Sequence, residues 1–421
     1  MALVVQKFGG TSVADADRMR AVAEQVALAR RHGDQVVLVV SAMGKETDDL
    51  LHLASQISSD RAGREMDMLI TAGERKATAL MCMALHDQGV DAESYTGSQA
   101  GFLTDTNHTN AKILEVRPER LRQAIEAGIV PVVGGSQGVS TEHNVTFLGR
   151  GGSDTTAVAL AGALDADVCE LYTDVSGVYT ADPRLVPTAR RIPRIRSDEM
   201  LEMCATGCPK PAMRSVEYAR NHEVTLHVRS AFTWERGTWI VDVPDPLDES
   251  DEPDATANED WTMEQAIIRA VTHDPSESKV TVHGVPDEPG IAARVFRRLA
   301  EQDVNVDMIV QNVSAEGVTD ISFTMPKEDL AVGSRLADEL AAEIGAAGVD
   351  TDERIARVSL VGAGMKSNPG VAARMFEVLA ENGINIEMIS TSAIRISCVV
   401  ALDDMERAVA SLHDAFDLAI P

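Results

Sequence analysis

The sequence predicts an α/β protein in which an αβα sandwich with a mainly parallel sheet is followed by two smaller βαββαβ units. Three observations support this prediction. Residues 1–241 alternate between β-branched runs and helical patterns, residues 242–264 are acidic, and residues 265–421 contain one motif twice. The length of 421 residues suits two or three domains.

Strand and helix patterns alternate throughout residues 1–241. Short runs rich in β-branched residues predict buried strands, and apolar residues at helical spacing predict helices between them. A parallel sheet of this kind binds its ligands at the carboxyl ends of the strands. The predicted strands are Leu3–Gln6, Val36–Val40, Ile129–Val133, Val168–Tyr172 and Thr225–Val228, and the predicted helices are Asp15–Arg31, Met66–Asp87 and Thr155–Leu164.

An acidic segment, residues 242–264, divides the chain. It contains ten acidic residues, three prolines and neither lysine nor arginine. A segment with this much charge buries too little apolar surface to offset the entropy lost on ordering it. We therefore interpret it as a solvated linker in preference to an acidic docking tail.

The C-terminal part contains an internal repeat. Residues 289–309 (PGIAARVFRRLAEQDVNVDMI) match residues 369–389 (PGVAARMFEVLAENGINIEMI). Strand patterns precede and follow each copy, which gives the βαββαβ order of a ferredoxin-like domain. We place the two units at residues 265–345 and 346–421. Their flanking strands are predicted at Lys279–Val282 and Thr319–Thr324 in the first unit, and at Arg357–Val361 and Ile394–Val400 in the second.

The charge of the chain excludes two classes of partner. Asp and Glu total 66 against 38 Lys and Arg, which gives a net charge of −28. Nucleic acids and anionic membranes require clustered basic residues, so neither is expected as a partner. The five cysteines are scattered, no apolar run reaches the ~18 residues of a membrane span, and no signal-peptide pattern is present. We expect a cytoplasmic protein that acts on small molecules.

The first motif of chemical interest is Lys7-Phe8-Gly9-Gly10-Thr11-Ser12, at the end of the first predicted strand. Adjacent glycines let backbone N–H groups approach an anion closely, and lysine supplies a positive charge suited to phosphate. A tight turn is the alternative explanation for the glycine pair.

A second glycine-rich motif, Leu148-Gly149-Arg150-Gly151-Gly152-Ser153-Asp154-Thr155-Thr156, opens a predicted helix. Arg150 between glycines suits binding of a carboxylate or a phosphate. Ser153 or Asp154 suits a helix cap. The two roles are compatible.

Three further segments are candidates for contact with ligands. Ser41-Ala42-Met43-Gly44 follows the second predicted strand, and Tyr172 to Arg184 follows a later strand, although its Asp and Pro residues are also typical of turns. Thr71-Ala72-Gly73-Glu74-Arg75 interrupts a helical pattern, and Glu74 either binds a substrate ammonium group or pairs with Arg75 or Lys76 at the surface. No spacing of cysteine and histidine predicts a metal site.

Taken together, these motifs and the C-terminal repeat resemble one family, the aspartate kinases (aspartokinases) of the actinobacterial type, over nearly the whole chain. The resemblance implies an amino-acid-kinase domain at residues 1–241 and two ACT units that bind effector amino acids, lysine and/or threonine. It implies transfer of phosphate from ATP, accompanied by Mg²⁺, to L-aspartate, the first step toward lysine, threonine and methionine. It also implies a homo-oligomer or an α2β2 assembly with the chain's own C-terminal fragment, for which Met263 is a plausible start.

The resemblance implies roles for individual residues. Attack of a carboxylate on a phosphoryl group needs positioning and neutralisation of charge more than covalent help. Catalytic roles fall to Lys7, Glu74 and Asp154. Aspartate binding falls to Ser41, Thr47, Glu74, Arg150, Gly151 and Ser153, ATP binding to Lys7, Gly9, Gly10, Thr173, Asp174, Tyr179, Asp182, Pro183, Arg184 and Lys210, and effector binding to Asn305, Asp307, Gln311, Asn385 and Ile386. No dedicated metal site is implied.

The sequence departs from the family pattern in three places. Pro209 stands where the family has a lysine that reaches ATP, and Lys210 follows one position later. Ser136 replaces an aromatic residue, and Ala393 replaces a glutamate. These departures leave two alternatives open: a degenerate kinase that senses amino acids, and a kinase for another acidic amino acid in a specialised pathway. Because the residues assigned to catalysis are intact, we favour catalysis on aspartate.

Overall fold

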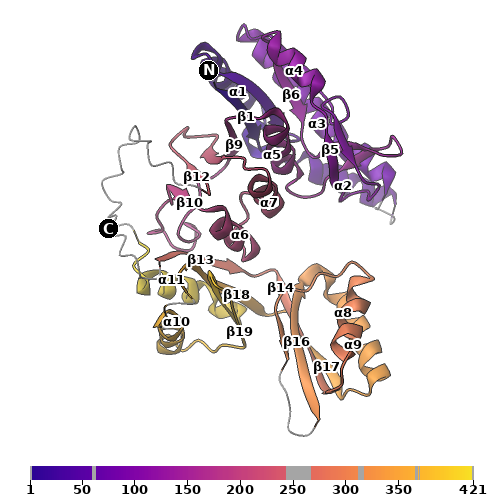
Figure 1. Cartoon of the computed structure of the whole chain (residues 1–421), viewed down its shortest axis with the longest axis vertical. Coiled ribbons are helices and arrows are strands. Elements are labelled where there is room, and N and C mark those ends of the chain that lie inside the picture. Colours follow the sequence, from indigo (N-terminus) through magenta and orange to yellow (C-terminus); the bar gives the residue numbers. More distant parts are fainter. Residues whose placement is uncertain are drawn as a thin grey trace. The chain divides into compact units, whose positions relative to one another are not determined.

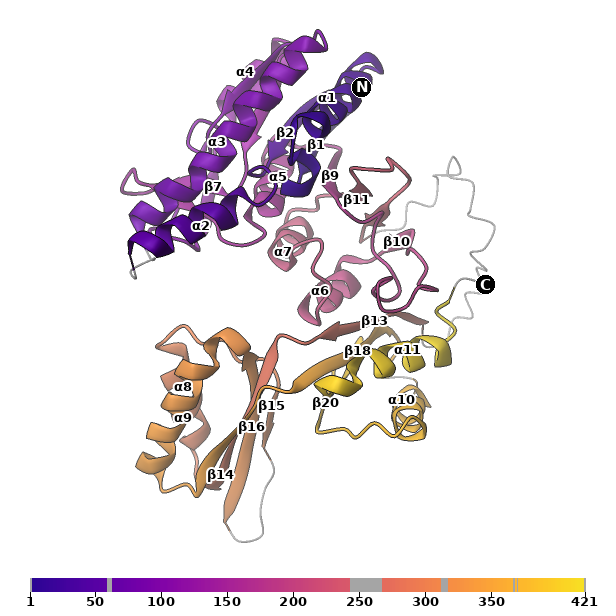
Figure 2. The same cartoon turned by 180° about the vertical axis from the view of Figure 1, so that it is seen from behind.

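The computed structural model describes residues 2–58, 63–242, 267–311, 317–365, 368 and 370–419. The chain forms two compact units, and Figures 1 and 2 show it from opposite sides. The first unit comprises residues 1–178, 191–204 and 209–252, and the second comprises residues 179–190, 205–208 and 253–421. Apart from Asp242, the predicted linker and Met263 lie outside the described residues, so both interpretations stay predictions.

None of the described helices is both long enough and apolar enough to span a lipid bilayer.

The first unit is built on a mainly parallel sheet, as predicted. Its described strands follow the order β10-β12-β11-β9-β1-β2-β6-β3, in which only β12 and β11 pair antiparallel. The five predicted strands are all present, within two residues at each end. The bounds are β1 Leu3–Phe8, β2 Gln35–Val40, β3 Ala92–Tyr95, β6 Val130–Gly134, β9 Val168–Thr173, β10 Arg194–Ile195, β11 Leu226–Ser230 and β12 Thr238–Ile240.

Helices pack against this sheet. α1 and α3 share an apolar core with β1, β2 and β6, in which Phe8, Leu38 and Met81 are fully buried. α5 packs against β1 and β9, and every residue from Gly152 to Ala161 is buried. The bounds are α1 Ala16–Arg31, α2 Glu46–Ile57, α3 Arg64–Asp87, α4 Glu119–Glu126, α5 Gly152–Leu164, α6 Ser197–Ala205, α7 Met213–Asn221 and the 3₁₀ helix η1 Gly10–Val13.

A small second sheet in this unit was not predicted. Its described strands follow the order β5-β4-β7-β8. They are only three or four residues long, so neither length nor alternation distinguishes them from loops. The bounds are β4 Phe102–Thr104, β5 Ile113–Val116, β7 Gln137–Ser140 and β8 Val145–Phe147.

The expected interruption at Thr71–Arg75 is wrong, because α3 runs through it without a break. Gly73 suggests a break in the sequence, since glycine weakens a helix interior by about 1 kcal/mol relative to alanine. Here its missing side chain permits close packing: a Cβ at Gly73 would lie 2.9 Å from the Cβ of Ala42. The glycine therefore lets α3 approach the loop after β2.

The second unit contains two four-stranded antiparallel sheets within its described residues. One follows the order β15-β16-β14-β17 and is covered by α8 and α9; the other follows β13-β18-β20-β19 and packs against α10 and α11 (Figures 1 and 2). The bounds are β13 Ile267–Asp274, β14 Glu277–Pro286, α8 Ile291–Ala300, β15 Ile309–Gln311, β16 Val318–Pro326, α9 Leu330–Ile344, β17 Gly348–Asp352, β18 Ile355–Ala363, α10 Gly370–Glu381, β19 Met388–Thr391, β20 Arg395–Ala401 and α11 Met405–Ala415.

The predicted division at residues 345 and 346 requires a correction. β13 falls in the first predicted unit but pairs with β18 of the second, in a register from Ile267–Ala363 to Asp274–Arg357. Conversely, β17 falls in the second predicted unit and pairs with β14 of the first. The reason is packing. Ala270 and Val271 of β13 are buried, and Val271 belongs to the apolar core of the second ACT unit, so the strand closes that sheet.

A segment from the N-terminal part of the chain also belongs to the second unit. Ala181, Val186 and Ala189 are buried in the core of the second ACT unit. Thr180 is 1% exposed, and its hydroxyl lies 2.9 Å from Nε2 of His413 and donates to the carbonyl oxygen of Leu418 at 3.1 Å. The contiguous boundary predicted at residue 241 therefore omits a loop that stabilises the second unit.

We predict that Thr180→Val lowers the free energy of unfolding of the second unit by about 1–3 kcal/mol, because it leaves buried polar groups of His413 and Leu418 without their partner. Urea denaturation combined with amide exchange of β13 and α11 measures the effect. Thr188→Val is the matched control, since Thr188 is exposed in the same segment. Equal effects of the two substitutions would contradict the assignment.

Candidate active site

The predicted site residues of the first unit gather at the carboxyl ends of its parallel strands. Lys7 lies near the end of β1, Ser41 follows β2, Gly134 ends β6 and Thr173 ends β9. β2, β1 and β9 are neighbours in the sheet, and β6 lies next to β2. Motifs far apart in the sequence are therefore adjacent in space, at the edge where α/β sheets bind ligands.

Lys7 and Asp154 form the central ion pair. Lys7 Nζ lies 2.6 Å from Asp154 Oδ1, and both side chains are largely buried, at 13% and 12% exposure. Asp154 lies in the first turn of α5, where the helix dipole favours negative charge. Its second oxygen, Oδ2, accepts a hydrogen bond from the backbone N–H of Ala212 at 3.2 Å.

Both glycines of the first motif lie within close contact of neighbouring groups. A Cβ at Gly10 would lie 2.8 Å from the carbonyl oxygen of Ala42, and one at Gly9 would lie 3.4 Å from Lys7 Nζ. The Gly44 N–H donates to the Gly10 carbonyl at 3.0 Å, which joins the loops after β1 and β2. The glycine pair thus forms the tight turn that was the alternative interpretation, and it also leaves space beside the ammonium group of Lys7.

Three serine hydroxyls form a chain beside this ion pair. Ser153 Oγ lies 2.9 Å from Ser41 Oγ and 2.9 Å from Ser136 Oγ. Ser136 has a φ of +58°, and its N–H donates to Thr156 Oγ1 at 3.0 Å. The residue that replaces the family's aromatic side chain therefore supplies a hydroxyl to the predicted substrate site. Sequence reasoning recognised the substitution but not this contact.

Glu74 is a buried carboxyl group. It is 3% exposed, and burial raises its pKa to about 7, assisted by the charge of Glu46 and opposed by hydrogen bonds from the backbone of Glu74 and Ala42. Among the described residues, its Oε2 has no hydrogen-bond partner. The surface-pair alternative is wrong, because the neighbouring Lys76 pairs with Glu46 at 2.6 Å instead. A buried carboxyl group with an open oxygen suits a cationic ligand.

Arg150 and its flanking glycines form an exposed loop. Gly149 and Gly151 have φ values of +84° and +70°, which side chains rarely adopt. Arg150 is exposed and makes no ion pair with any described residue. Thr47 lies in the first turn of α2 and is half-buried. Arg150 is thus available to an anionic ligand.

Asp174 and Lys210 form an ion pair beyond the end of β9. The hydroxyl of Thr173 donates to Asp174 Oδ1 at 3.0 Å. Burial alone would raise the pKa of Asp174, but the hydrogen bond and charge of Lys210 lower it below its usual value. The displaced lysine therefore contacts one predicted nucleotide residue.

The other predicted nucleotide residues belong to the second unit. Tyr179 packs against the core of the second ACT unit, and Asp182 pairs with Arg184 at 2.6 Å. The hydrogen bond from Arg184 lowers the pKa of Asp182. Pro183, between them, is exposed. Of the predicted nucleotide residues, Tyr179, Asp182, Pro183 and Arg184 thus fall outside the first unit.

The predicted effector residues lie in the loops before β15 and β19 of the ACT units, except Gln311, which ends β15. Asn305, Asp307, Gln311 and Asn385 are exposed, and Ile386 packs against the second core. Asp307 forms an ion pair with Arg357, a 2% exposed residue that also contacts Glu277 at 2.8 Å. Burial raises the pKa of Glu277 to about 7, although the charge of Arg357 opposes this. The sequence indicated Asp307 but not Arg357.

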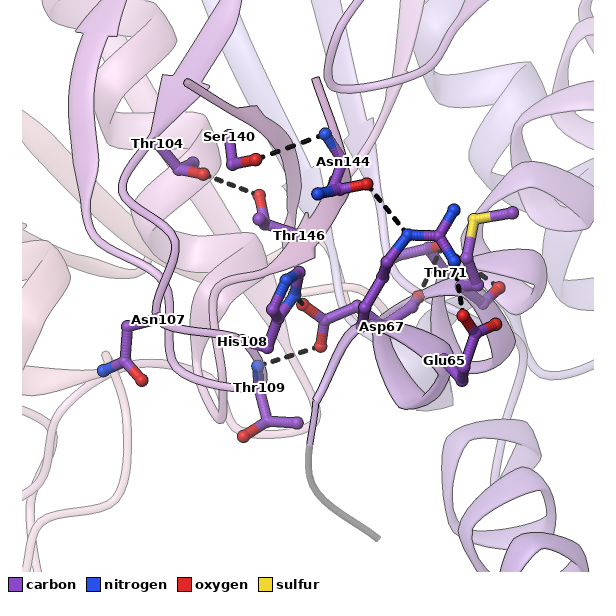
Figure 3. Close-up of polar contacts among 12 residues, drawn as sticks. Glu65, Asp67, Thr71, Thr104, Asn107, His108, Thr109, Ser140, Asn144 and Thr146 are labelled. Carbon is purple, nitrogen blue, oxygen red and sulfur yellow. Dashed lines mark hydrogen bonds and ion pairs between the residues drawn. The ribbon is translucent and has the colours of Figure 1, made fainter. Parts of the chain in front are cut away.

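A buried aspartate on α3 escaped sequence analysis altogether. Asp67 is fully buried, and its carboxylate lies between two groups of the loop after β4 (Figure 3). His108 Nδ1 lies 2.7 Å from Oδ2, and the N–H of Thr109 donates to Oδ1 at 2.9 Å. Thr109 has a φ of +67°, so these contacts stabilise an unusual backbone. No motif or spacing distinguishes Asp67 from a surface acid.

Comparison with known proteins agrees with this geometry. The amino acid kinase family profile matches residues 2–230, and ACT domain profiles match residues 279–345 and 358–416. The fold and site therefore define an amino acid kinase followed by two ACT domains. An aspartokinase from Mycolicibacterium smegmatis is 53% identical, over 99% of this chain and 97% of that protein. The chain belongs to the aspartokinase family, which confirms the resemblance seen in its motifs.

Two solved structures extend this comparison. Escherichia coli aspartokinase III in complex with aspartate and ADP is 25% identical and has a TM-score of 0.79. The same enzyme in complex with lysine and aspartate is 25% identical, with a TM-score of 0.72. Each comparison covers 98% of this chain and 99% of the other.

We predict that Lys7→Met lowers kcat by about 10²–10³, because it removes the buried positive charge beside Asp154, where the sequence predicts phosphate binding. Steady-state kinetics with ATP and an acidic amino acid measures the change. Lys76→Met is the control, since Lys76 is half exposed in an ion pair with Glu46. A comparable loss in the control would argue against a specific role for Lys7.

We predict a pH dependence that originates at Glu74. With a pKa of about 7 the free carboxyl group is mostly protonated at pH 6 and ionised at pH 8, and only the ionised form attracts an ammonium group. Accordingly kcat/KM for the amino acid should rise through about pH 7, and Glu74→Gln should abolish the rise. Glu65→Gln, at an 83% exposed position of the same helix, should leave it unchanged.

The same shift affects stability with a defined sign. The folded pKa lies above the ordinary value of 4.5, so the contribution of Glu74 is complete below about pH 4.5 and is lost as pH rises through about 7. Glu74→Gln should therefore reduce the fall in the free energy of unfolding between pH 5 and 8. An unchanged fall in urea titrations would contradict the assigned burial.

Proposed function

We propose that this chain phosphorylates the side-chain carboxylate of L-aspartate with ATP, giving ADP and 4-phospho-L-aspartate. The observation that supports the proposal most directly is the set of complementary charges at one sheet edge. Lys7 is buried beside Asp154, Glu74 offers an unpaired carboxyl oxygen, and Arg150 has no ion-pair partner among the described residues. Aspartate carries an ammonium group and two carboxylates, and ATP carries negatively charged phosphates, so this set of residues offers an opposite charge to each of these groups.

On the phosphate side, Lys7 supplies positive charge where the transferred phosphoryl group gains negative charge. The backbone at Gly9 carries no side chain beside this ammonium group, since a Cβ there would lie 3.4 Å from Lys7 Nζ, which leaves room for a phosphate. Asp154 accepts hydrogen bonds from Lys7 and from the Ala212 N–H, so it orients the ammonium group toward the phosphates. The carboxylate of aspartate is already ionised at neutral pH and needs no general base.

On the acceptor side, Glu74 binds the ammonium group of aspartate and Arg150 binds a carboxylate through paired N–H donors. The serine chain supplies hydroxyls within the same site. The ammonium group of aspartate would thus face Glu74 and a carboxylate would face Arg150, and these two contacts would fix the orientation of the substrate. The residues proposed to bind aspartate are Ser41, Thr47, Glu74, Arg150, Gly151 and Ser153.

The proposal assigns the nucleotide to the loops after β9 and before α7. Lys210 takes the place of the displaced family lysine, because it reaches Asp174 beside Thr173. ATP would carry Mg²⁺ with it, and the ion would neutralise part of the phosphate charge beside Lys7. The residues proposed to bind ATP are Lys7, Gly9, Gly10, Thr173, Asp174, Tyr179, Asp182, Pro183, Arg184 and Lys210.

We propose that the ACT units adjust this activity by binding lysine, threonine or both, through Asn305, Asp307, Gln311, Asn385 and Ile386. The structure of Escherichia coli aspartokinase III in complex with lysine and aspartate supports an amino acid as the effector. We also propose that the chain assembles as a homo-oligomer, or as α2β2 with its own C-terminal fragment. We propose further that it acts in the cytoplasm, in lysine and threonine biosynthesis. The intact charge set argues against a degenerate kinase that only senses amino acids.

The decisive experiment is ATP-dependent hydroxamate formation with hydroxylamine. We expect product with L-aspartate and little with L-glutamate, together with inhibition by lysine, threonine or their mixture. Product with glutamate alone would support a different acceptor. A folded protein that binds lysine or threonine but forms no hydroxamate from any acidic amino acid would support the sensor alternative.

A further inference from the structure

Arg214 holds two loops of the first unit at a fixed separation. It lies in the first turn of α7, and its side chain is half-buried. One terminal nitrogen, Nη1, donates to the carbonyl oxygen of Leu148 at 2.9 Å, and the other, Nη2, donates to that of Ala111 at 2.9 Å. The two acceptors belong to separate loops, so one rigid group sets the distance between them.

The chemistry of the guanidinium group suits this double contact. Its donors lie in one plane and point in fixed directions, whereas a lysine ammonium is a point charge on a flexible stem. Burial lowers the pKa of Arg214, partly opposed by the charges of Asp105 and Glu217. A guanidinium nevertheless stays protonated in proteins, so the contact does not depend on pH.

The first of the two loops contains Arg150. Leu148 is buried, its N–H donates to the Ser136 carbonyl at 2.8 Å, and its own carbonyl accepts from Arg214. The two glycines that flank Arg150, Gly149 and Gly151, have φ values of +84° and +70°, conformations that glycine adopts with little restriction. Contacts from outside the loop must therefore determine where the side chain of Arg150 points.

The second loop, residues 107–111, supports the first. Asp67 anchors it through His108 and Thr109, as Figure 3 shows. At its far end, the Ala111 N–H donates to the Phe147 carbonyl at 2.9 Å. The loops also touch directly, since a Cβ at Gly149 would lie 3.0 Å from Asn110 Oδ1. Arg214 thus connects the loop that contains Arg150 to residues 107–111, the loop that Asp67 of α3 holds in place.

The residue two positions before Arg214 reaches the phosphate side of the site. The Ala212 N–H donates to Asp154 Oδ2 at 3.2 Å, and a Cβ at Gly151 would lie 2.5 Å from the Cβ of Ala212. Residues 212–214 therefore contact both the partner of Lys7 and the loop of Arg150. A shift of this segment would move both.

We propose that Arg214 is a positioning residue for the acceptor: its paired hydrogen bonds to Leu148 and Ala111 fix the loop that aims Arg150 at a carboxylate of aspartate. The inference rests on the proposed function. It assigns Arg214 no contact with substrate, because its terminal nitrogens are engaged by the two carbonyls. Loss of the two hydrogen bonds from Arg214 should therefore weaken the binding of aspartate more than the binding of ATP.

The test compares Arg214→Lys with Arg220→Lys in the full chain. Arg220 is exposed on the same helix and serves as the matched control. For Arg214→Lys we expect KM for aspartate to rise about ten- to hundredfold, with KM for ATP within about twofold, since small misplacement of a binding group has effects of this size. Aspartate affinity measured by titration calorimetry should fall in parallel, and Arg220→Lys should change neither quantity.

Arg214→Met supplies a second measurement, because added methylguanidinium should restore part of the aspartate affinity if the guanidinium itself is required. A lower melting temperature in Arg214→Lys with unchanged aspartate affinity would show a merely structural role and overturn the inference. An equal rise in KM for both substrates would overturn it too. Absence of aspartate binding by the unaltered protein would overturn the proposed function, and the inference with it.

Discussion

The ion pair between Lys7 and Asp154 is the contact on which the arrangement of the first unit depends. It joins the end of β1 to the first turn of α5, and the second oxygen of Asp154 extends the connection to the segment before α7. A charge pair this buried is stable only if its remaining donors and acceptors find partners. The Ala212 N–H is one such partner, and the missing side chain of Gly151 lets the segment of Ala212 approach closely. The glycine at position 151 and the buried charge of Asp154 are therefore linked through one segment, residues 212–214.

Buried carboxylates in the first unit differ in their partners, and this difference distinguishes residues that stabilise the fold from residues suited to binding a ligand. Burial alone would raise the pKa of Glu170, yet His227, Arg229 and Gln6 lower it to about 2. Asp67 has His108 and a backbone N–H. Glu74 makes no ion pair with any residue that the structure describes, and burial raises its pKa to about 7. Paired acids of the first kind stabilise the fold, whereas an unpaired acid at a ligand edge is typical of a binding site.

Sequence patterns predicted the local features well and the non-local ones poorly. The strands of the parallel sheet and the glycine-rich motifs were predictable because β-branched runs and glycine pairs have physical meaning within a few residues. The exchange of β13 and β17 between the ACT sheets was not, because two similar repeats offer a strand equally acceptable partners. Arg214 escaped because its partners are backbone carbonyls, which leave no signature in residue type. Asp67 escaped because its partners, the His108 ring and the Thr109 N–H, lie about 40 residues further along the chain. The role of Thr180 was hidden by sequence separation, because the His413 ring and the Leu418 carbonyl lie more than 200 residues further along the chain.

The path of the chain between the two units bears on what happens if it is cut. Before the acidic segment begins, the chain leaves the first unit twice, at residues 179–190 and at residues 205–208. It returns to the first unit after each of these two segments. A protease nick in that segment would yield two fragments, but the longer one would still have Ala181, Val186 and Ala189 buried in the apolar core formed by the shorter one. The fragments would therefore remain together without a covalent link, and their release would require the second ACT core to open.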